Sequence, residues 1–196
     1  MDKFSNRFLP ALALAVDPAE KDIMNRKPLK PKKGVFTKGM TYRIIYQGVM
    51  IGILTLIAFI IGLATPENQL PEVKIENSDG TIRILTVEET KVEIGQAMAF
   101  TVLALSELVH VYSIRNNKKS VFKTGIFNNS KLVLATLGSA ALMIIVLTVP
   151  ALRNIFSIPV LPLMNILEIV ILVFMPLVIV ETFKFLKINT TKGEIS

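Results

Sequence analysis

The sequence contains no cysteine, no tryptophan and a single histidine, His110. Without cysteine the chain can form no disulfide bond and can offer no thiolate to a metal. One histidine alone argues against a zinc or similar transition-metal centre, because such centres take most of their ligands from these two residue types. We therefore interpret His110 as a packed, neutral histidine near the end of a helix.

The sequence also lacks the short motifs that accompany common enzymatic chemistry. It has no G-x-x-x-x-G-K-[ST] phosphate loop and no G-x-S-x-G nucleophile elbow. The basic stretch at residues 27–38 is interrupted by Pro28, Pro31 and Gly34, which makes it too irregular for a helix that reads nucleic acid. The sequence thus predicts no catalytic residue, no bound cofactor and no nucleic-acid partner, and we expect the isolated chain not to be an enzyme.

What the chain does have is apolar sequence in long blocks. Hydrophobic residues make up 52% of it, and the mean hydropathy is +0.56. Four blocks stand out, at about residues 42–64, 94–114, 132–149 and 163–186. A run of about 18 or more apolar residues is long enough to cross the hydrocarbon core of a bilayer as a helix. The predicted fold is therefore an all-α membrane protein with four transmembrane helices. The lipid bilayer is one of its expected partners.

The charged residues predict how these helices are oriented. Basic residues gather before the first block, between the second and third, and after the fourth: Lys21, Arg26, Lys27, Lys30, Lys32, Lys33, Lys38, Arg115, Lys118, Lys119, Lys123, Lys184, Lys187 and Lys192. The loop at residues 65–93 instead carries seven acidic and three basic residues, and the loop at 150–162 carries only Arg153. The positive-inside rule then places both termini in the cytoplasm. We expect a cytoplasmic segment at 1–40, a transmembrane domain at 41–187 and a cytoplasmic tail at 188–196.

The first external loop contains two short alternating segments around Asp79-Gly80. Residues 73–76 and 82–85 alternate apolar and polar side chains on either side of this turn sequence. Such a pattern is typical of a β-hairpin. A short hairpin and an irregular loop both remain open for this segment.

Gly48 and Gly52 form a G-x-x-x-G pattern inside the first apolar block. Two glycines at this spacing give a flat strip on a helix, where the backbone of another helix can approach closely. The pattern also arises by chance in membrane helices. A helix-packing contact and the absence of any special role are the two alternatives.

Glu107 lies well inside the second apolar block, about thirteen residues from its start. A carboxylate at this depth is costly in a bilayer and is by default a candidate for an ion path. Calcium would suit it, because hard cations take oxygen ligands. The alternative is a glutamate that holds helices together, with His110 or Ser106 as its partner.

Several stretches of the chain resemble one known family. Residues 9–14 (LPALAL) and 17–28 (DPAEKDIMNRKP) resemble the segment that follows the sixth membrane helix of P-type cation-transporting ATPases. Residues 99–115 (AFTVLALSELVHVYSIR) look like the eighth helix, and residues 176–184 (PLVIVETFK) like the end of the tenth. The resemblance covers nearly the whole chain from Leu9 onward and is greatest to calcium pumps.

The sequence departs from the family pattern in two respects. The family places N-x-x-x-D calcium ligands just before the Leu-Pro, where this chain has Lys3, Asn6 and Arg7. The D-K-T-G-T phosphorylation motif, the T-G-E-S loop and the G-D-G-x-N-D hinge are absent from the sequence. We therefore expect a C-terminal segment with an unrelated start at residues 1–8, which cannot hydrolyse ATP alone.

The resemblance implies a role and a location for the segment. It would brace the ion-carrying helices of a calcium pump in a bacterial plasma membrane, with the remaining helices and cytoplasmic domains of the pump as partners. Glu107 would then be a metal ligand in the ion path, and Arg115 a neighbour of the ion site, because some bacterial members carry a basic residue that suits one-calcium transport with proton counter-transport. The alternative is a stand-alone scaffold or regulatory subunit that binds another transporter.

Overall fold

The computed structural model of the chain describes residues 38–76, 82–115, 120–121, 125–156 and 158–186. Four long helices run lengthwise through these residues: α2 (Lys38–Leu63), α3 (Val87–Ile114), α5 (Ser130–Thr148) and α7 (Leu163–Phe185). Each is long and apolar enough to cross a membrane. The prediction of four transmembrane helices is confirmed. Of the segments predicted at 1–40 and 188–196, residues 38–40 belong to α2 and the rest lie outside the described residues, so the orientation of the termini stays a prediction.

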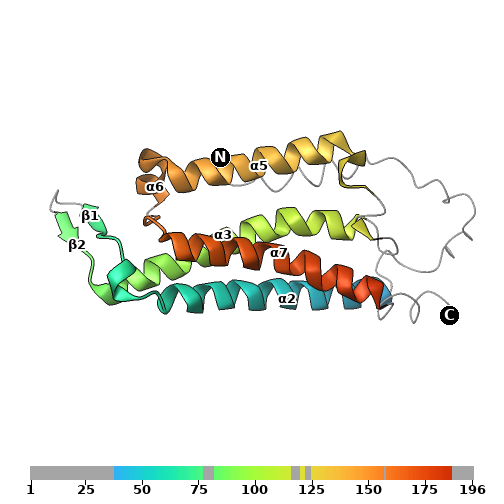
Figure 1. Cartoon of the computed structure of the whole chain (residues 1–196), viewed down its shortest axis with the longest axis horizontal. Helices are drawn as coiled ribbons and strands as arrows, with labels where there is room; N and C mark the ends of the chain where they lie inside the picture. The colour runs from blue at the N-terminus through green and yellow to red at the C-terminus, as the bar shows by residue number, and fades with distance from the viewer. Residues whose placement is uncertain (1–37, 77–81, 116–119, 122–124, 157, 187–196) are drawn as a thin grey trace, which may run out of the picture.

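Three of the four helices share one core. Helices α2, α3 and α7 pack side by side, while α5 lies along α3 on the side away from α2 (Figure 1). Apolar side chains from these three helices form the buried cluster: Leu54, Ala58, Ile94, Met98, Val102, Ile169, Leu172 and Val173. Helix α3 is therefore the central element, and most of the polar side chains discussed below belong to it.

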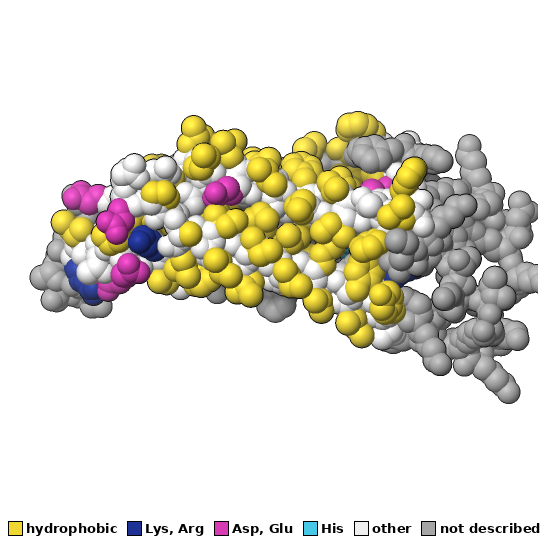
Figure 2. Space-filling model, turned by 60° about the horizontal axis from the view of Figure 1, so that its bottom comes forward, with side chains coloured by type: hydrophobic (Ala, Val, Ile, Leu, Met, Phe, Trp, Pro, Cys, Tyr) yellow, Lys and Arg dark blue, Asp and Glu magenta, His cyan; other side chains and the backbone are white. Residues whose placement is uncertain are grey.

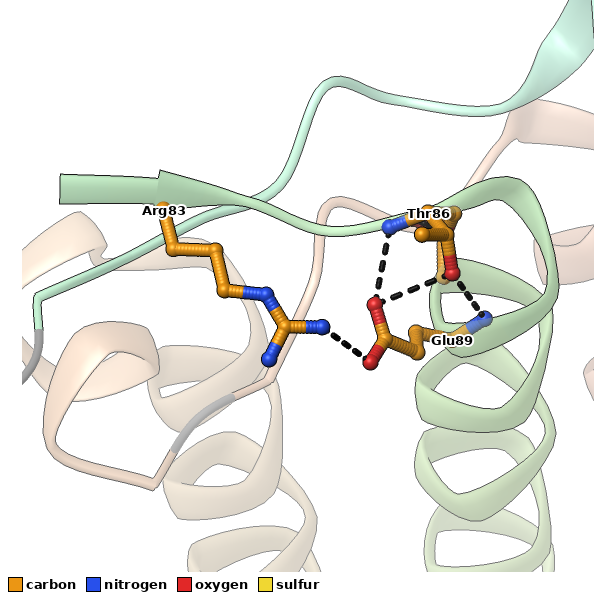
Figure 3. A network of polar contacts seen from close by, with 4 residues as sticks. Arg83, Thr86 and Glu89 are labelled. Atoms are coloured by element: carbon orange, nitrogen blue, oxygen red, sulfur yellow. Dashed lines mark hydrogen bonds and ion pairs between the residues drawn. The ribbon is translucent and has the colours of Figure 1, made fainter.

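Helix α3 begins at Val87 rather than at about Ile94, as its apolar block predicted. A capping box explains the longer helix. The Thr86 hydroxyl accepts from the Glu89 backbone N–H, and the Glu89 carboxylate accepts from the Thr86 backbone N–H at 2.9 Å. These bonds satisfy backbone donors that the first turn of a helix leaves unpaired. Arg83 pairs with the same carboxylate from the preceding strand (Figure 3).

The loop between α2 and α3 contains the hairpin that the sequence left open. Strands β1 (Lys74–Glu76) and β2 (Ile82–Ile84) pair antiparallel, with Ile75 opposite Arg83. A one-turn helix, η2 (Glu67–Gln69), precedes them. The hairpin interpretation is confirmed. This loop lies at the same end of the bundle as the short helix α6 (Pro150–Phe156), and we call it the hairpin end (Figure 1).

The opposite end holds the link between α3 and α5, and we call it the connector end. Here α3 reaches its C-cap at Arg115, and the one-turn helix η3 (Ile126–Asn128) leads into α5. Gly125 has a φ of +83°, a conformation that favours glycine. The Asn129 side chain then caps α5 by accepting from the Leu132 backbone N–H at 3.0 Å.

The outer surface of the bundle is apolar over most of its length. Figure 2 shows hydrophobic side chains covering the middle of one face, with most charged groups of the described residues gathered at the hairpin end. Several polar side chains of α3 are buried instead: Thr90, Thr101, Ser106, His110 and Ser113. Apolar side chains outside and polar side chains inside suit a bilayer. Lipid tails are as apolar as leucine, so burying apolar groups away from them gains nothing.

Candidate functional site

Glu107 lies on α3 and is half-buried. It forms no hydrogen bond or ion pair with any residue that the structure describes. Ser106, the proposed partner next to it, instead donates its hydroxyl to the Leu103 carbonyl at 3.2 Å. His110 likewise has no hydrogen bond from either ring nitrogen. Neither Ser106 nor His110, the two partners expected for a glutamate that holds helices together, binds Glu107.

Arg115 is the C-cap residue of α3 and lies eight residues after Glu107. At 1.5 Å per residue this separates their backbones by about 12 Å along the helix. The guanidinium donates from Nη1 to the Gly125 carbonyl at 3.2 Å. Arg115 thus binds the turn before η3, at the connector end. The structure does not bring Arg115 and Glu107 together.

Gly48 and Gly52 lie on the exposed side of α2. A methyl group added to either would meet no atom within 4 Å. The strip is therefore open within the described part of the chain, and neither glycine packs against α3 or α7. A packing role for this strip needs a helix from outside these residues.

A different pair of glycines makes the close helix contact. A methyl group added to Gly62 of α2 would lie 2.7 Å from the backbone nitrogen of Gly95 on α3. One added to Gly95 would lie 2.9 Å from the Phe59 carbonyl oxygen. Real Cβ atoms do not approach so closely, so only glycine lets the two backbones meet here. The contact holds α2 against α3 near the hairpin end.

A buried amide joins three elements at the same end. The Asn165 side chain of α7 donates to the Thr65 hydroxyl, just after α2, at 3.0 Å. It also lies 3.0 Å from the Met98 sulfur of α3. All three are buried, and hydrogen bonds between membrane helices stabilise their association. Asn165 was not among the predicted site residues, although a lone amide in an apolar block indicates a buried polar contact.

A buried ion pair holds the connector end. The Lys184 ammonium lies 2.8 Å from the Glu181 carboxylate, and the two side chains are 8% and 11% exposed. Lys184 also donates to the Ser113 carbonyl of α3 at 2.7 Å, and Glu181 accepts from the Val121 backbone N–H at 3.2 Å. We call these four residues the clasp. The i,i+3 spacing of the two residues on α7 suits an ion pair, but neither its burial nor its bonds to α3 and the connector follow from that spacing.

The clasp places charge where helix electrostatics favour it. The carbonyls in the last turn of a helix have no intrahelical partner and carry partial negative charge. The Lys184 ammonium binds one of them, and Glu181 neutralises that ammonium within the low-dielectric bundle. The pair therefore joins α7 to the end of α3 without leaving a net buried charge.

Helix α5 is joined to α3 by a hydrogen bond between two hydroxyls. The hydroxyl of Tyr112 lies 2.5 Å from that of Thr136. The Thr136 hydroxyl also donates to the Leu132 carbonyl of its own helix at 2.9 Å. Since a hydroxyl has one proton, Tyr112 is then the donor between the helices.

A comparison with protein families decides which class of protein contains this bundle. The family described as "Cation transporting ATPase, C-terminus" matches residues 4–186. The chain belongs to this family. The match begins at residue 4, so the unrelated start expected at residues 1–8 is wrong for residues 4–8. Its extent covers all four transmembrane helices of the cation-transporting ATPase segment.

Individual relatives agree with the family match. The segment is 36% identical over 184 residues to calcium-transporting ATPase 1 of Bacillus cereus. The aligned region covers 92% of this chain and 20% of that protein. It is 36% identical over 149 residues to the calcium-transporting ATPase of Bacillus subtilis, covering 76% and 14%. It is 25% identical over 186 residues to human calcium-transporting ATPase type 2C member 1, covering 95% and 18%. The chain thus spans about a fifth of the length of these relatives.

The cation-transporting ATPase segment offers little to a cation on its own. Within the described ranges no group of three or more acidic or histidine residues could hold a metal ion. Calcium takes six to eight oxygen ligands, and Glu107 supplies at most two. A cation site that used Glu107 would need further oxygen ligands beside this carboxylate.

Proposed function

We propose that this chain is the C-terminal transmembrane segment of a calcium-transporting P-type ATPase in a bacterial plasma membrane. The observation that carries the proposal is the family match over residues 4–186 together with relatives that are named calcium-transporting ATPases. In this role the four helices brace the helices that carry the ion. The connector end, with its surplus of basic residues, faces the cytoplasm.

The surface for this bracing is the open face of α2. Gly48 and Gly52 present bare backbone there, and exposed Ile44 and Val49 lie beside them. Helix α2 already uses its opposite side, with Leu54 and Ala58, for the core. We infer that a helix from the remaining four-fifths of the pump packs onto the glycine strip. Close approach at such a strip is favourable because small residues let two backbones meet in van der Waals contact.

Glu107 is the residue of this segment that would reach the transported ion. Its carboxylate is half-buried within α3 and lacks a partner among the described residues, so it is free to contribute oxygen ligands. Arg115 lies at the C-terminal end of α3, about 12 Å from Glu107 along the helix axis, and would act on the site only through its charge. Calcium would thus be shared between Glu107 and ligands of the ion-carrying helices.

The decisive experiment is a chimeric pump. Residues 4–186 of this chain replace the matched region of calcium-transporting ATPase 1 of Bacillus cereus, and ATP-driven calcium uptake is measured in inverted vesicles. We expect uptake to be retained. A chimera that folds and is phosphorylated by ATP but never transports calcium would contradict the proposal.

Matched variants of the chimera test the individual residues. Gly48→Leu should abolish or strongly reduce uptake, whereas Gly138→Leu on α5, which is equally open, should not. Glu107→Gln should raise the calcium concentration needed for half-maximal uptake, whereas Glu168→Gln, another half-buried glutamate, should leave it unchanged. Arg115→Gln should change the pH dependence of uptake. If Glu107→Gln and Arg115→Gln change neither calcium affinity nor pH dependence, both residues lie outside the ion path.

The isolated chain should neither hydrolyse ATP nor drive calcium uptake after reconstitution. Purified chain that does either would refute the role of a supporting segment. The absence of native cysteine makes the orientation easy to measure as well. Asn68→Cys at the hairpin end should react with an impermeant maleimide in intact cells, and Phe127→Cys at the connector end only after permeabilisation.

A further inference from the structure

Unpaired polar atoms gather at the connector end of α3. Both ring nitrogens of His110 and the hydroxyl of Ser113 have no hydrogen-bond partner in the part of the chain that the structure describes, and the two residues are 7% and 1% exposed. They are three positions apart, so their side chains lie on the same face of the helix. Buried polar groups are almost always hydrogen-bonded, so a group of them without partners points to a ligand.

Lys184 limits what this ligand can be. Its ammonium binds the carbonyl of Ser113 at 2.7 Å. The ion pair with Glu181 leaves the place without net charge, so nothing here attracts a metal cation. An anion is not favoured either, because Glu181 already neutralises Lys184 at 2.8 Å.

The unpaired groups include both hydrogen-bond donors and hydrogen-bond acceptors. A neutral imidazole has one donor and one acceptor nitrogen, and a serine hydroxyl both donates and accepts. Lys184 has three ammonium protons, and the bonds to Ser113 and Glu181 account for two of them. A ligand that satisfies such a set must donate and accept hydrogen bonds at once, be small and carry no charge.

We propose that a buried water molecule binds between α3 and α7, hydrogen-bonded to His110, Ser113 and Lys184. Internal waters make two to four hydrogen bonds to groups that would otherwise be unpaired. The site lies within about 6 Å of the end of α3 along its axis, by the rise of 1.5 Å per residue, so bulk water is near. The inference concerns the chain by itself and is independent of calcium transport.

The lone histidine allows a direct test. The full chain is labelled with ¹⁵N-histidine, reconstituted into bilayers of deuterated lipid, and studied by solid-state NMR with selective transfer of magnetisation from water protons. Every imidazole signal then comes from His110. We expect transfer from water to the ring nitrogens.

A matched pair of variants locates the water. Ser113→Ala removes one of its partners and should cause loss of the transfer or slow it. Ser139→Ala makes the same change at another buried hydroxyl without a partner, on α5, and should leave the transfer unchanged.

Three results would overturn the proposal. In the folded wild-type chain, these are no transfer from water, transfer from residual lipid protons instead, or a direct ¹⁵N–¹³C coupling between the imidazole and a glutamate carboxylate. An equal effect of the two serine variants would also overturn it. Because the wild-type chain alone can give the first three results, the test does not depend on any variant folding.

Discussion

Different kinds of interaction hold the helices together at the two ends of the bundle. At the hairpin end the helices meet through bare backbone at Gly62 and Gly95 and through the neutral amide of Asn165. At the connector end they are joined by the buried charges of Lys184 and Glu181. The hairpin end also has charged residues, but Arg83 and Glu89 are on its surface, 54% and 40% exposed.

The two kinds of contact are sensitive to different mutations. Close packing is lost when volume is added, because a backbone contact has no room to relax. A buried ion pair is lost when one partner is removed, because the remaining charge stays in a low-dielectric place. An exposed pair loses little in either case, since water replaces the partner.

The largest effect is expected at the clasp. Lys184→Met leaves the Glu181 carboxylate buried without its cation and should lower the free energy of unfolding by about 3 kcal/mol. Reversible unfolding in mixed micelles, followed by circular dichroism, measures this. The double variant Glu181→Gln/Lys184→Met removes both charges and should cost less than Lys184→Met alone. If the double variant is instead the less stable of the two, the charges themselves are not what holds this end.

The second effect is expected at the glycine contact. Gly62→Val forces a side chain into the backbone of Gly95 and should lower the free energy of unfolding by about 2 kcal/mol. Gly48→Val places the same side chain on the same helix where no atom lies within 4 Å, and serves as the control. Equal losses in the two variants would mean that helix propensity, and not the contact with α3, controls the result.

A smaller loss is expected for the neutral hydrogen bond. Asn165→Leu removes the bond to Thr65 while it fills similar volume, and should cost about 0.6 kcal/mol, the average for hydrogen bonds between membrane helices. Thr148→Val is the control, because its hydroxyl bonds only to carbonyls of its own helix. A loss as large as that of Lys184→Met would erase the distinction between the two ends.

The smallest effect is expected at the surface pair of the hairpin end. Arg83→Gln should leave the unfolding midpoint unchanged within error, at low and at high salt, because both partners are solvated. Thr86→Ala, which removes the cap of α3 a few residues away, should shift the midpoint measurably. A salt-sensitive loss in Arg83→Gln would show that the charges of this end also stabilise the fold.

The sequence predicted those features that depend on neighbours along the chain. The four helices follow from run length, and the hairpin follows from the alternation around Asp79-Gly80. The early start of α3 was also readable, since Thr86 and Glu89 have the spacing of a capping box. The apolar pattern outweighed that signal.

Features that depend on how helices align in space could not be predicted in this way. Gly62 and Gly95 are separated by a whole loop, and nothing local distinguishes them from Gly48 and Gly52, whose spacing is the more conspicuous. Likewise the sequence shows Glu181 beside Lys184, but not that Val121 and Ser113 meet them. Glu107 was chosen for its depth, and its lack of a partner among the described residues could be learned only from the structure.

The position of the clasp has a consequence for the synthesis of the protein. Glu181 and Lys184 belong to the last turns of α7, so the ribosome makes them after α2, α3 and α5 have been translated. Until then the carbonyl of Ser113 and the amide of Val121 lack the partners that they have in the finished bundle. A nascent chain that stops short of α7 therefore exposes unpaired backbone at one membrane boundary, a feature by which a membrane protease can distinguish it from a chain that contains α7.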